Sequence, residues 1–392
     1  MQGFGFGTLA LLTAVGFAGP LLASLPRLRI PVIIGELIAG LVLGKTGFGV
    51  INAANPTFQL FANIGFALVM FVVGTHVPVR GREMRSAVPL ALARVVLSGL
   101  AAAALGLGLA AEFGTHHAAL YAVLMASSSA ALALPVIDSL RLQGPHVLSV
   151  TTQIAIADAA CIVLLPLVID FRRAPTAALS ALTIAGCAVV LFLLLRAVDR
   201  TGWLQRLHTY SEKHQLALEL RTNLFVLFAL AALAVNTHVS IMLAGFALGL
   251  VIAAVGEPRR LARQLFGITE GFFSPLFFVW LGASLQVREL GSHPKFIMLG
   301  IGLGLGAVLT HCVGRLLGQP LTFAVLSAAQ LGVPVAAATI GTEQHLLAAG
   351  ESSALMFGAL LTIASTSIAG ALAARGQTVT NADAPADTDK PA

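Results

Sequence analysis

The chain has 392 residues, of which 57% are apolar and only 10% are charged, with a formal net charge of +6 and a mean hydropathy of +0.92. An ordinary soluble domain carries roughly 25% charged residues, so this composition excludes a soluble globular protein. Its three cysteines lie inside apolar stretches and have no disulfide spacing. We therefore expect an all-α polytopic membrane protein with no cofactor and no nucleic-acid partner.

Thirteen apolar stretches each approach the ~20 residues that cross a bilayer as a helix. Their approximate ranges are 7–24, 30–49, 58–77, 87–111, 117–137, 148–170, 175–196, 216–235, 239–255, 269–287, 295–318, 320–342 and 352–374. The first stretch is interpreted as a retained helix because no basic segment precedes it. Residues 1–375 then form one membrane domain. The polar residues 376–392 are predicted to form a disordered cytoplasmic tail.

The basic residues in the connecting loops are unevenly distributed. With the N-terminus outside, fifteen lysines and arginines fall in cytoplasmic loops and only five (Lys45, Arg172, Arg173, Arg288 and Lys295) fall in outer loops. Cytoplasmic loops of membrane proteins carry the excess of basic residues. This bias predicts an outside N-terminus and a cytoplasmic C-terminus in a cell inner membrane or plasma membrane, and it accounts for the net positive charge.

Two pairs of segments match at nearly the same offset. Residues 70–80 align with 278–288 at an offset of 208, which pairs Gly74 with Gly282, and 35–42 align with 244–251 at an offset of 209. Equivalent helices lie seven spans apart along the chain. Because seven is an odd number, the two copies are oppositely oriented. The predicted repeats are about 7–170 and about 216–375, joined by a linker helix at 175–196. Inverted repeats of this kind are the architecture of secondary transporters.

Helix-breaking residues occur at corresponding places in the two predicted repeats. The fifth span contains three consecutive serines (Ser127, Ser128 and Ser129) and Pro135, and the twelfth contains Gly332 and Pro334. Interrupted helices leave backbone groups that need polar partners at membrane depth. We therefore expect two broken helices that cross in the core.

The sixth span holds one ionisable side chain, Asp158, within "TTQIAIADAACIVLLPLV" (151–168). A membrane-centred carboxylate costs ~2.5–3.5 kcal/mol on insertion scales and normally marks a functional site. A single group that takes up either a proton or a cation is sufficient for exchange. The three serines are candidate oxygen ligands beside it, and Thr151, Thr152 and Gln153 are candidates for an access path.

With these residues identified, the chain resembles the monovalent cation:proton antiporters, in the branch of bacterial sodium/proton exchangers and potassium-efflux systems. The resemblance is carried by "PRLRIPVIIGELIAGLVLGKTGFG" (26–49), by "FFSPLFFVWLGASLQV" (272–287), and by the serine-rich crossing followed by the Asp-bearing helix. It implies a homodimer in which a core domain moves like an elevator against a scaffold. The implied activity is exchange of Na⁺ or K⁺ for H⁺, with no metal bound beyond that cation and no enzymatic reaction.

Two positions depart from the family pattern. The residue before Asp158 is Ala157, where many members have Asp, Asn or Gln. A single carboxylate releases one charge at a time, which favours electroneutral exchange. His311 stands where the family often has Lys, which makes it a candidate pH gate or counter-ion because histidine titrates near neutral pH.

Other embedded charges and other functions need separate interpretation. Arg94, Arg315 and Glu36 are interpreted as structurally paired, because buried charges need partners. The alternative functions are a channel-like potassium-efflux protein, a proton- or sodium-coupled transporter of organic solutes on a related inverted-repeat fold, and a membrane protein that does not transport.

Overall fold

The computed structural model describes residues 4–24, 32–76, 82–171, 174–200, 216–237, 240–256, 259–285, 294–348 and 350–382, with isolated positions between 206 and 214 and at 288 and 291. The first half contains α1 (Phe6–Gly16), α2 (Ala18–Ala23), α3 (Val32–Leu43), α4 (Pro56–His76), α5 (Arg82–Phe113), α6 (Ala118–Ala126), α7 (Ala130–Ser139), α8 (Pro145–Ile169) and α9 (Ala174–Arg200). The second half contains α11 (Leu218–Asn236), α12 (Ile241–Val255), α13 (Arg259–Ile268), the π-helix η1 (Thr269–Phe273), α14 (Ser274–Ser284), α16 (Pro294–Cys312), the 3₁₀-helix η2 (Val313–Leu317), α17 (Leu321–Leu326), α18 (Gly332–Glu343) and α19 (Glu351–Ala382).

The described helices are those of a polytopic membrane protein. Among the described residues, ten helices are long and apolar enough to cross a membrane, and three shorter apolar helices are Val32–Leu43, Ile241–Val255 and Gly332–Thr342. Each of the thirteen predicted ranges overlaps one of these segments. The number of crossings stays a prediction. Helix α19 continues to Ala382, beyond residue 375, and the rest of the tail lies outside the described residues.

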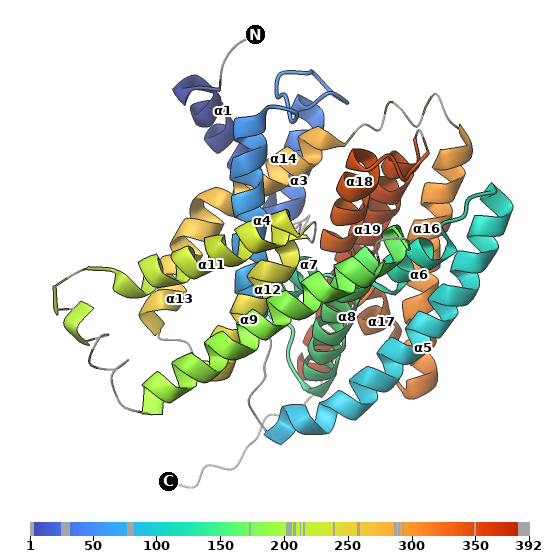
Figure 1. The fold of residues 1–392 in the computed structure, drawn as a ribbon. Helices are drawn as coiled ribbons and strands as arrows, with labels where there is room; N and C mark the ends of the chain where they lie inside the picture. Colours follow the sequence, from blue (N-terminus) through green and yellow to red (C-terminus); the bar gives the residue numbers. More distant parts are fainter. Residues whose placement is uncertain are drawn as a thin grey trace, which may run out of the picture.

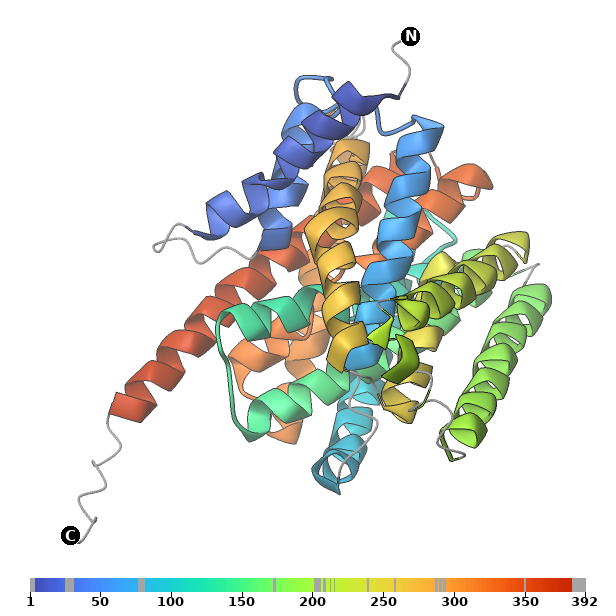
Figure 2. The same cartoon turned by 90° about the vertical axis from the view of Figure 1, so that its left-hand side faces the viewer.

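The helices form two groups that α9 connects (Figure 1). In one group, α3 packs against α14, α4 packs against α12 and α14, and α1, α2 and α11 lie around them. In the other, α5, α6 and α8 pack together, as do α16, α17, α18 and α19. Helix α9 contacts α12 in the first group and α8 in the second. Figure 2 shows α19 as a long, oblique helix whose carboxyl end extends beyond the other helices. The site described below lies in the second group.

Glycines bring the backbones of two helix pairs in the first group into close contact. A methyl group on Gly282 of α14 would lie 3.0 Å from Cα of Gly40 in α3, and one on Gly74 of α4 would lie 2.8 Å from Cα of Gly249 in α12. The offsets found in the sequence pair Gly40 with Gly249 and Gly74 with Gly282. The two contacts therefore exchange under the predicted repeat, which supports it. The matched positions Val79, Arg80 and Val287 lie outside the described residues.

Candidate functional site

The predicted break in the fifth span falls at the serines. Helix α6 ends at Ala126, Ser127 and Ser129 have extended backbone angles, and α7 begins at Ala130. Pro135 lies inside α7 and does not mark the interruption. The carboxyl end of α6 and the amino end of α7 therefore meet within one apolar segment, and their terminal backbone groups have no partners within their own helices.

A second break lies between α17, which ends at Leu326, and α18, which begins at Gly332. It therefore precedes the predicted Gly332–Pro334 position, because Gly332 and Pro334 are the first and third residues of α18. A proline in the first helical turn needs no amide hydrogen, so Pro334 is compatible with the start of this helix. The two breaks are in contact, because the Ser128 hydroxyl donates to the carbonyl oxygen of Ser327 at 2.5 Å.

Asp158 lies on α8 against the first break. Its side chain is 1% exposed, and the N–H of Ala130, the first residue of α7, donates to its Oδ2 at 3.0 Å. The amino end of a helix carries partial positive charge and free N–H groups, so it stabilises an anion. The break thus supplies the polar partner that the apolar sequence around Asp158 lacks.

The three predicted serine ligands differ in what their hydroxyls contact, although all three are buried. Ser127 donates to the carbonyl oxygen of Leu124 at 2.7 Å, which is ordinary bonding to the preceding turn. The Ser128 hydroxyl already bonds across the crossing. The Ser129 oxygen has no hydrogen-bond partner among the described residues. Ser129 directly precedes the amide that contacts Asp158, so it is the serine best placed to offer an oxygen there.

The three residues predicted to line an access path also differ in their contacts. Gln153 is buried, accepts from Gln319 Nε2 at 2.9 Å, and places its own Nε2 3.4 Å from the Ser327 hydroxyl. It therefore connects α8 to the second break. Thr152 donates back to the carbonyl oxygen of Leu148 at 2.8 Å, and Thr151 is partly exposed. Only Gln153 of these three joins the polar cluster around the crossing.

His311 contacts the crossing through Ser128 and has no hydrogen bond or ion pair with Asp158 in the structure. Its Nδ1 lies 2.9 Å from the carbonyl oxygen of Ala307, and its Nε2 lies 3.2 Å from Ser128 Oγ. A carbonyl oxygen can only accept, so Nδ1 carries a proton. In the neutral ring Nε2 can then only accept. The Ser128 hydroxyl can therefore donate its single proton either to Nε2 or to the carbonyl oxygen of Ser327. In the imidazolium both ring nitrogens donate, and the Ser128 proton goes to Ser327.

The embedded arginines behave differently from the interpretation as charge pairs. Arg94 is buried, and its guanidinium donates to Ser149 Oγ at 2.8 Å and to the carbonyl oxygen of Leu317 at 3.0 Å. Its described partners are therefore neutral oxygens. Arg315 lies in η2, inside the candidate membrane span Pro294–Leu317, and its side chain is exposed on the surface of the structure.

A polar cluster that was not predicted joins the two halves of the chain. His117 Nδ1 lies 2.6 Å from Glu351 Oε1, and the Tyr121 hydroxyl donates to the same oxygen at 2.6 Å. The hydrogen bond with the Glu351 carboxylate raises the pKa of His117, and burial opposes that shift. Because 234 residues separate His117 from Glu351, no local pattern in the sequence indicated this contact.

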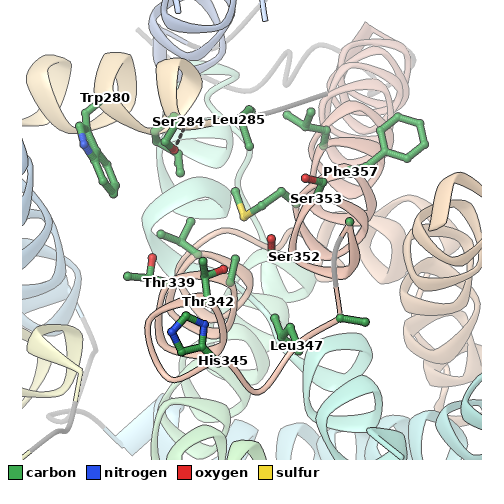
Figure 3. A pocket seen from close by; sticks show the side chains of 17 residues that line it. Trp280, Ser284, Leu285, Thr339, Thr342, His345, Leu347, Ser352, Ser353 and Phe357 are labelled. Atoms are coloured by element: carbon green, nitrogen blue, oxygen red, sulfur yellow. Dashed lines mark hydrogen bonds between the residues drawn. The ribbon is translucent and has the colours of Figure 1, made fainter. Parts of the chain in front are cut away.

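Cavities separate the two groups of helices beside α18. A cavity of about 460 Å³ has residues of α14 on one side and residues of α18 and α19 on the other. Figure 3 shows Trp280 and Ser284 from α14 opposite Thr339 and Thr342 from α18. A second cavity of about 360 Å³ between α4, α12, α14 and α18 shares Trp280 and Thr339 with the first. The contact between the two groups is therefore incompletely packed on this side.

The chain is similar in sequence to two ion-transport proteins. The chain is 28% identical over 347 residues to the Na⁺/H⁺ antiporter NhaS5 of Synechocystis, covering 83% of this chain and 48% of that protein. It is 28% identical over 327 residues to the glutathione-regulated potassium-efflux protein KefC of Salmonella typhi, covering 80% and 51%. The chain thus spans about half the length of these relatives.

The fold also matches that of a solved structure. The sodium proton antiporter MjNhaP1 from Methanocaldococcus jannaschii at pH 8 superposes with a TM-score of 0.65 at 17% identity, covering 96% of this chain and 97% of that one. The family model of the transmembrane sodium/hydrogen exchangers matches residues 11–374, which is nearly the whole membrane domain. This chain belongs to the sodium/hydrogen exchanger family.

Proposed function

We propose that the protein exchanges a monovalent cation, Na⁺ or K⁺, for H⁺ across the membrane at a site centred on Asp158. The observation that carries the proposal is a buried carboxylate on α8 whose described hydrogen-bond donor is the amino end of an interrupted helix. Family membership supports transport rather than an enzymatic reaction.

Competition at one carboxylate couples the two fluxes. Asp158 binds a proton when the cation is absent and releases it when a cation occupies the site. The free Ser129 oxygen and the backbone groups of the break supply the hard oxygen ligands that an alkali cation prefers. Transferring the empty, charged carboxylate through the apolar interior is costly, so the site crosses only when it carries one of its two ligands.

We propose that the group of helices that contains Asp158 moves relative to the group formed by α3, α4, α12 and α14. The cavities between the two groups of helices leave room for one group to move relative to the other. The residues around them lie near helix ends that the predicted orientation places outside, which supports an outward-open state. We also propose a homodimer with a cytoplasmic C-terminus, as the family resemblance implies.

We further propose that exchange is electroneutral. Ala157 gives the position before Asp158 no titratable group, and among the described residues Asp158 is the one carboxylate at the crossing of the two breaks. One proton is then replaced by one monovalent cation, and a full cycle moves no net charge.

The test is cation-dependent dissipation of a preset proton gradient in proteoliposomes, measured with Na⁺, K⁺, Li⁺ and Rb⁺. We expect a response to Na⁺ or K⁺ that keeps the same rate when a membrane potential is imposed with valinomycin and potassium, with Na⁺ as the test ion. A clear voltage dependence would contradict electroneutral exchange. The absence of a response to every cation would contradict exchange itself.

A further inference from the structure

A third cavity lies away from Asp158, at the junction of α1, α2, α3, η1 and α14. Its volume is about 220 Å³, and its walls include Thr13, Gly16, Glu36 and Glu270. None of these residues belongs to the helices that form the crossing. The cavity therefore needs an explanation separate from that of the Asp158 site.

Glu36 is the unusual member of this wall. Its side chain is 2% exposed, and its Oε2 has no hydrogen-bond partner among the described residues. The prediction that Glu36 is structurally paired is therefore not met at this oxygen. Glu270, with an exposed side chain, lies in the wall of the same cavity and adds a second carboxylate. A buried carboxylate is costly unless something neutralises it, and the cavity gives a ligand room to do so.

Two prolines lie in the same wall, one in the first turn of α2 and one in the first turn of α14. Pro20 has no amide hydrogen for the carbonyl of Gly16, four residues earlier, and Pro275 has none for the turn that contains Gly271. A methyl group on Gly16 would lie 3.0 Å from Cβ of Pro275, so the end of α1 and the start of α14 are in close contact. Carboxylate and carbonyl oxygens together form a hard donor set of the kind that alkali cations prefer.

The helix packing itself does not require a carboxylate at this position. Under the offset of 209, Glu36 of α3 corresponds to Gly245 of α12, and a methyl group there would lie 3.1 Å from Cβ of Met70 in α4. The α4–α12 contact thus forms with no side chain at all where the α3–α14 contact carries Glu36. Glu36 is better explained by a ligand than by packing.

We propose that this cavity is a second binding site for a monovalent cation, with Glu36 as its buried ligand and Glu270 at its rim. A single positive charge balances the single buried carboxylate, whereas Glu270 is exposed and needs no buried counter-ion. The bound cation holds α1 and α2 against α3 and α14, in the group of helices opposite the transport site. The site therefore stabilises that group and takes no part in the exchange cycle.

The test measures how alkali cations change thermal unfolding of the full-length protein in detergent. Titrations of NaCl, KCl, LiCl and RbCl are compared with choline chloride at equal ionic strength, in the Asp158→Asn variant so that the transport site does not contribute. A ligand that binds only the folded protein raises the unfolding midpoint in a saturable way. We expect a saturable rise of about 2 °C in this variant, and its loss in the Asp158→Asn/Glu36→Gln double variant.

Glu112 is exposed on α5, and an Asp158→Asn/Glu112→Gln double variant serves as the matched control that should keep the rise. If Asp158→Asn shows the same midpoint in choline and in all alkali salts, the proposal is wrong. It is also wrong if the rise survives Glu36→Gln, if only Ca²⁺ or Mg²⁺ produces it, or if the midpoint follows pH alone. If Glu36→Gln fails to fold, equilibrium binding of radioactive Na⁺, K⁺ or Rb⁺ to Asp158→Asn decides between binding and none. Failure of the Asp158 mechanism would appear separately, as cation effects that are equal in wild type and Asp158→Asn.

Discussion

Two buried carboxylates in this protein have opposite surroundings. Asp158 accepts a hydrogen bond from the amino end of α7 and lies among the interrupted helices of one group. Glu36 lies in a regular helix of the other group, and one of its oxygens faces a cavity without a described partner. The difference teaches that the cost of a buried charge can be met in two ways. An interrupted helix provides a backbone donor at the Asp158 site, whereas Glu36 is left to a mobile ligand.

The largest expected effect comes from removing the Asp158 charge. Asp158→Asn keeps an oxygen that can accept from Ala130 but cannot exchange a proton for a cation. We expect flux at the background of empty liposomes with the fold intact, and partial activity with altered apparent affinity for Asp158→Glu. Proton-gradient dissipation and size-exclusion chromatography measure the two properties. Cation-dependent proton flux in Asp158→Asn would contradict a mechanism centred on this carboxylate.

A smaller effect separates the serines of the first break. Ser129→Ala removes the hydroxyl that has no described partner, so we expect a rise in the apparent KM for the cation of about fivefold, which corresponds to the loss of about 1 kcal/mol. Ser127→Ala is the matched control, because its hydroxyl already bonds to Leu124. Equal KM values in the two variants would show that neither hydroxyl contacts the ion.

The histidine at the crossing is expected to change the pH profile more than the maximal rate. Because the protonation state of His311 decides where the Ser128 proton goes, His311→Gln should relieve inhibition at acid pH by about twofold to threefold. Ser128→Ala should give the same profile, and the double variant should add nothing further. If His311→Gln keeps the wild-type profile, His311 only packs within α16.

The smallest effect concerns stability at the contact between His117 and Glu351. A folded-state pKa raised above the unfolded value of about 6.5 gives stability that is complete below that pH and is lost as the pH rises through the folded value. Between pH 6 and pH 9 the unfolding midpoint of wild type should fall by about 2 °C more than that of His117→Gln. Parallel curves for the two proteins would show that the pair adds no pH-dependent stability.

The sequence was sufficient to predict the helical class and the family, and it singled out Asp158, which the structure places against the first break. Asp158 stands out because it is alone in an apolar helix, and a run of three serines is a strong local signal for a break. Pro334 was a misleading signal, because a proline three residues into a helix fits its start as well as it fits an interruption. Sequence spacing placed the second break too far along the chain for that reason.

Contacts across the molecule were beyond prediction from local pattern. Which of Ser127, Ser128 and Ser129 keeps a free hydroxyl depends on rotamers that form only when α6, α8 and α17 are packed together. His311 was a candidate pH gate or counter-ion, and in the structure it contacts the crossing through Ser128. The burial of Glu36 was clear from its apolar neighbours, whereas its missing partner became visible only with the cavity.

The glycine contacts in the α3, α4, α12 and α14 group restrict how that group can deform. At Gly40 and Gly282, and again at Gly74 and Gly249, the backbones touch where no side chain separates them. Sliding one helix along its partner would bring a side chain three residues away, such as Leu37 or Ile252, to a place that has room only for hydrogen, so the glycine contacts oppose shear within a pair. Each pair then moves as a rigid unit, and any change of shape must occur in the segments that connect the pairs to the rest of the protein. Helix α9, which contacts both groups, is the connection that would bend or rotate when the two groups move relative to each other.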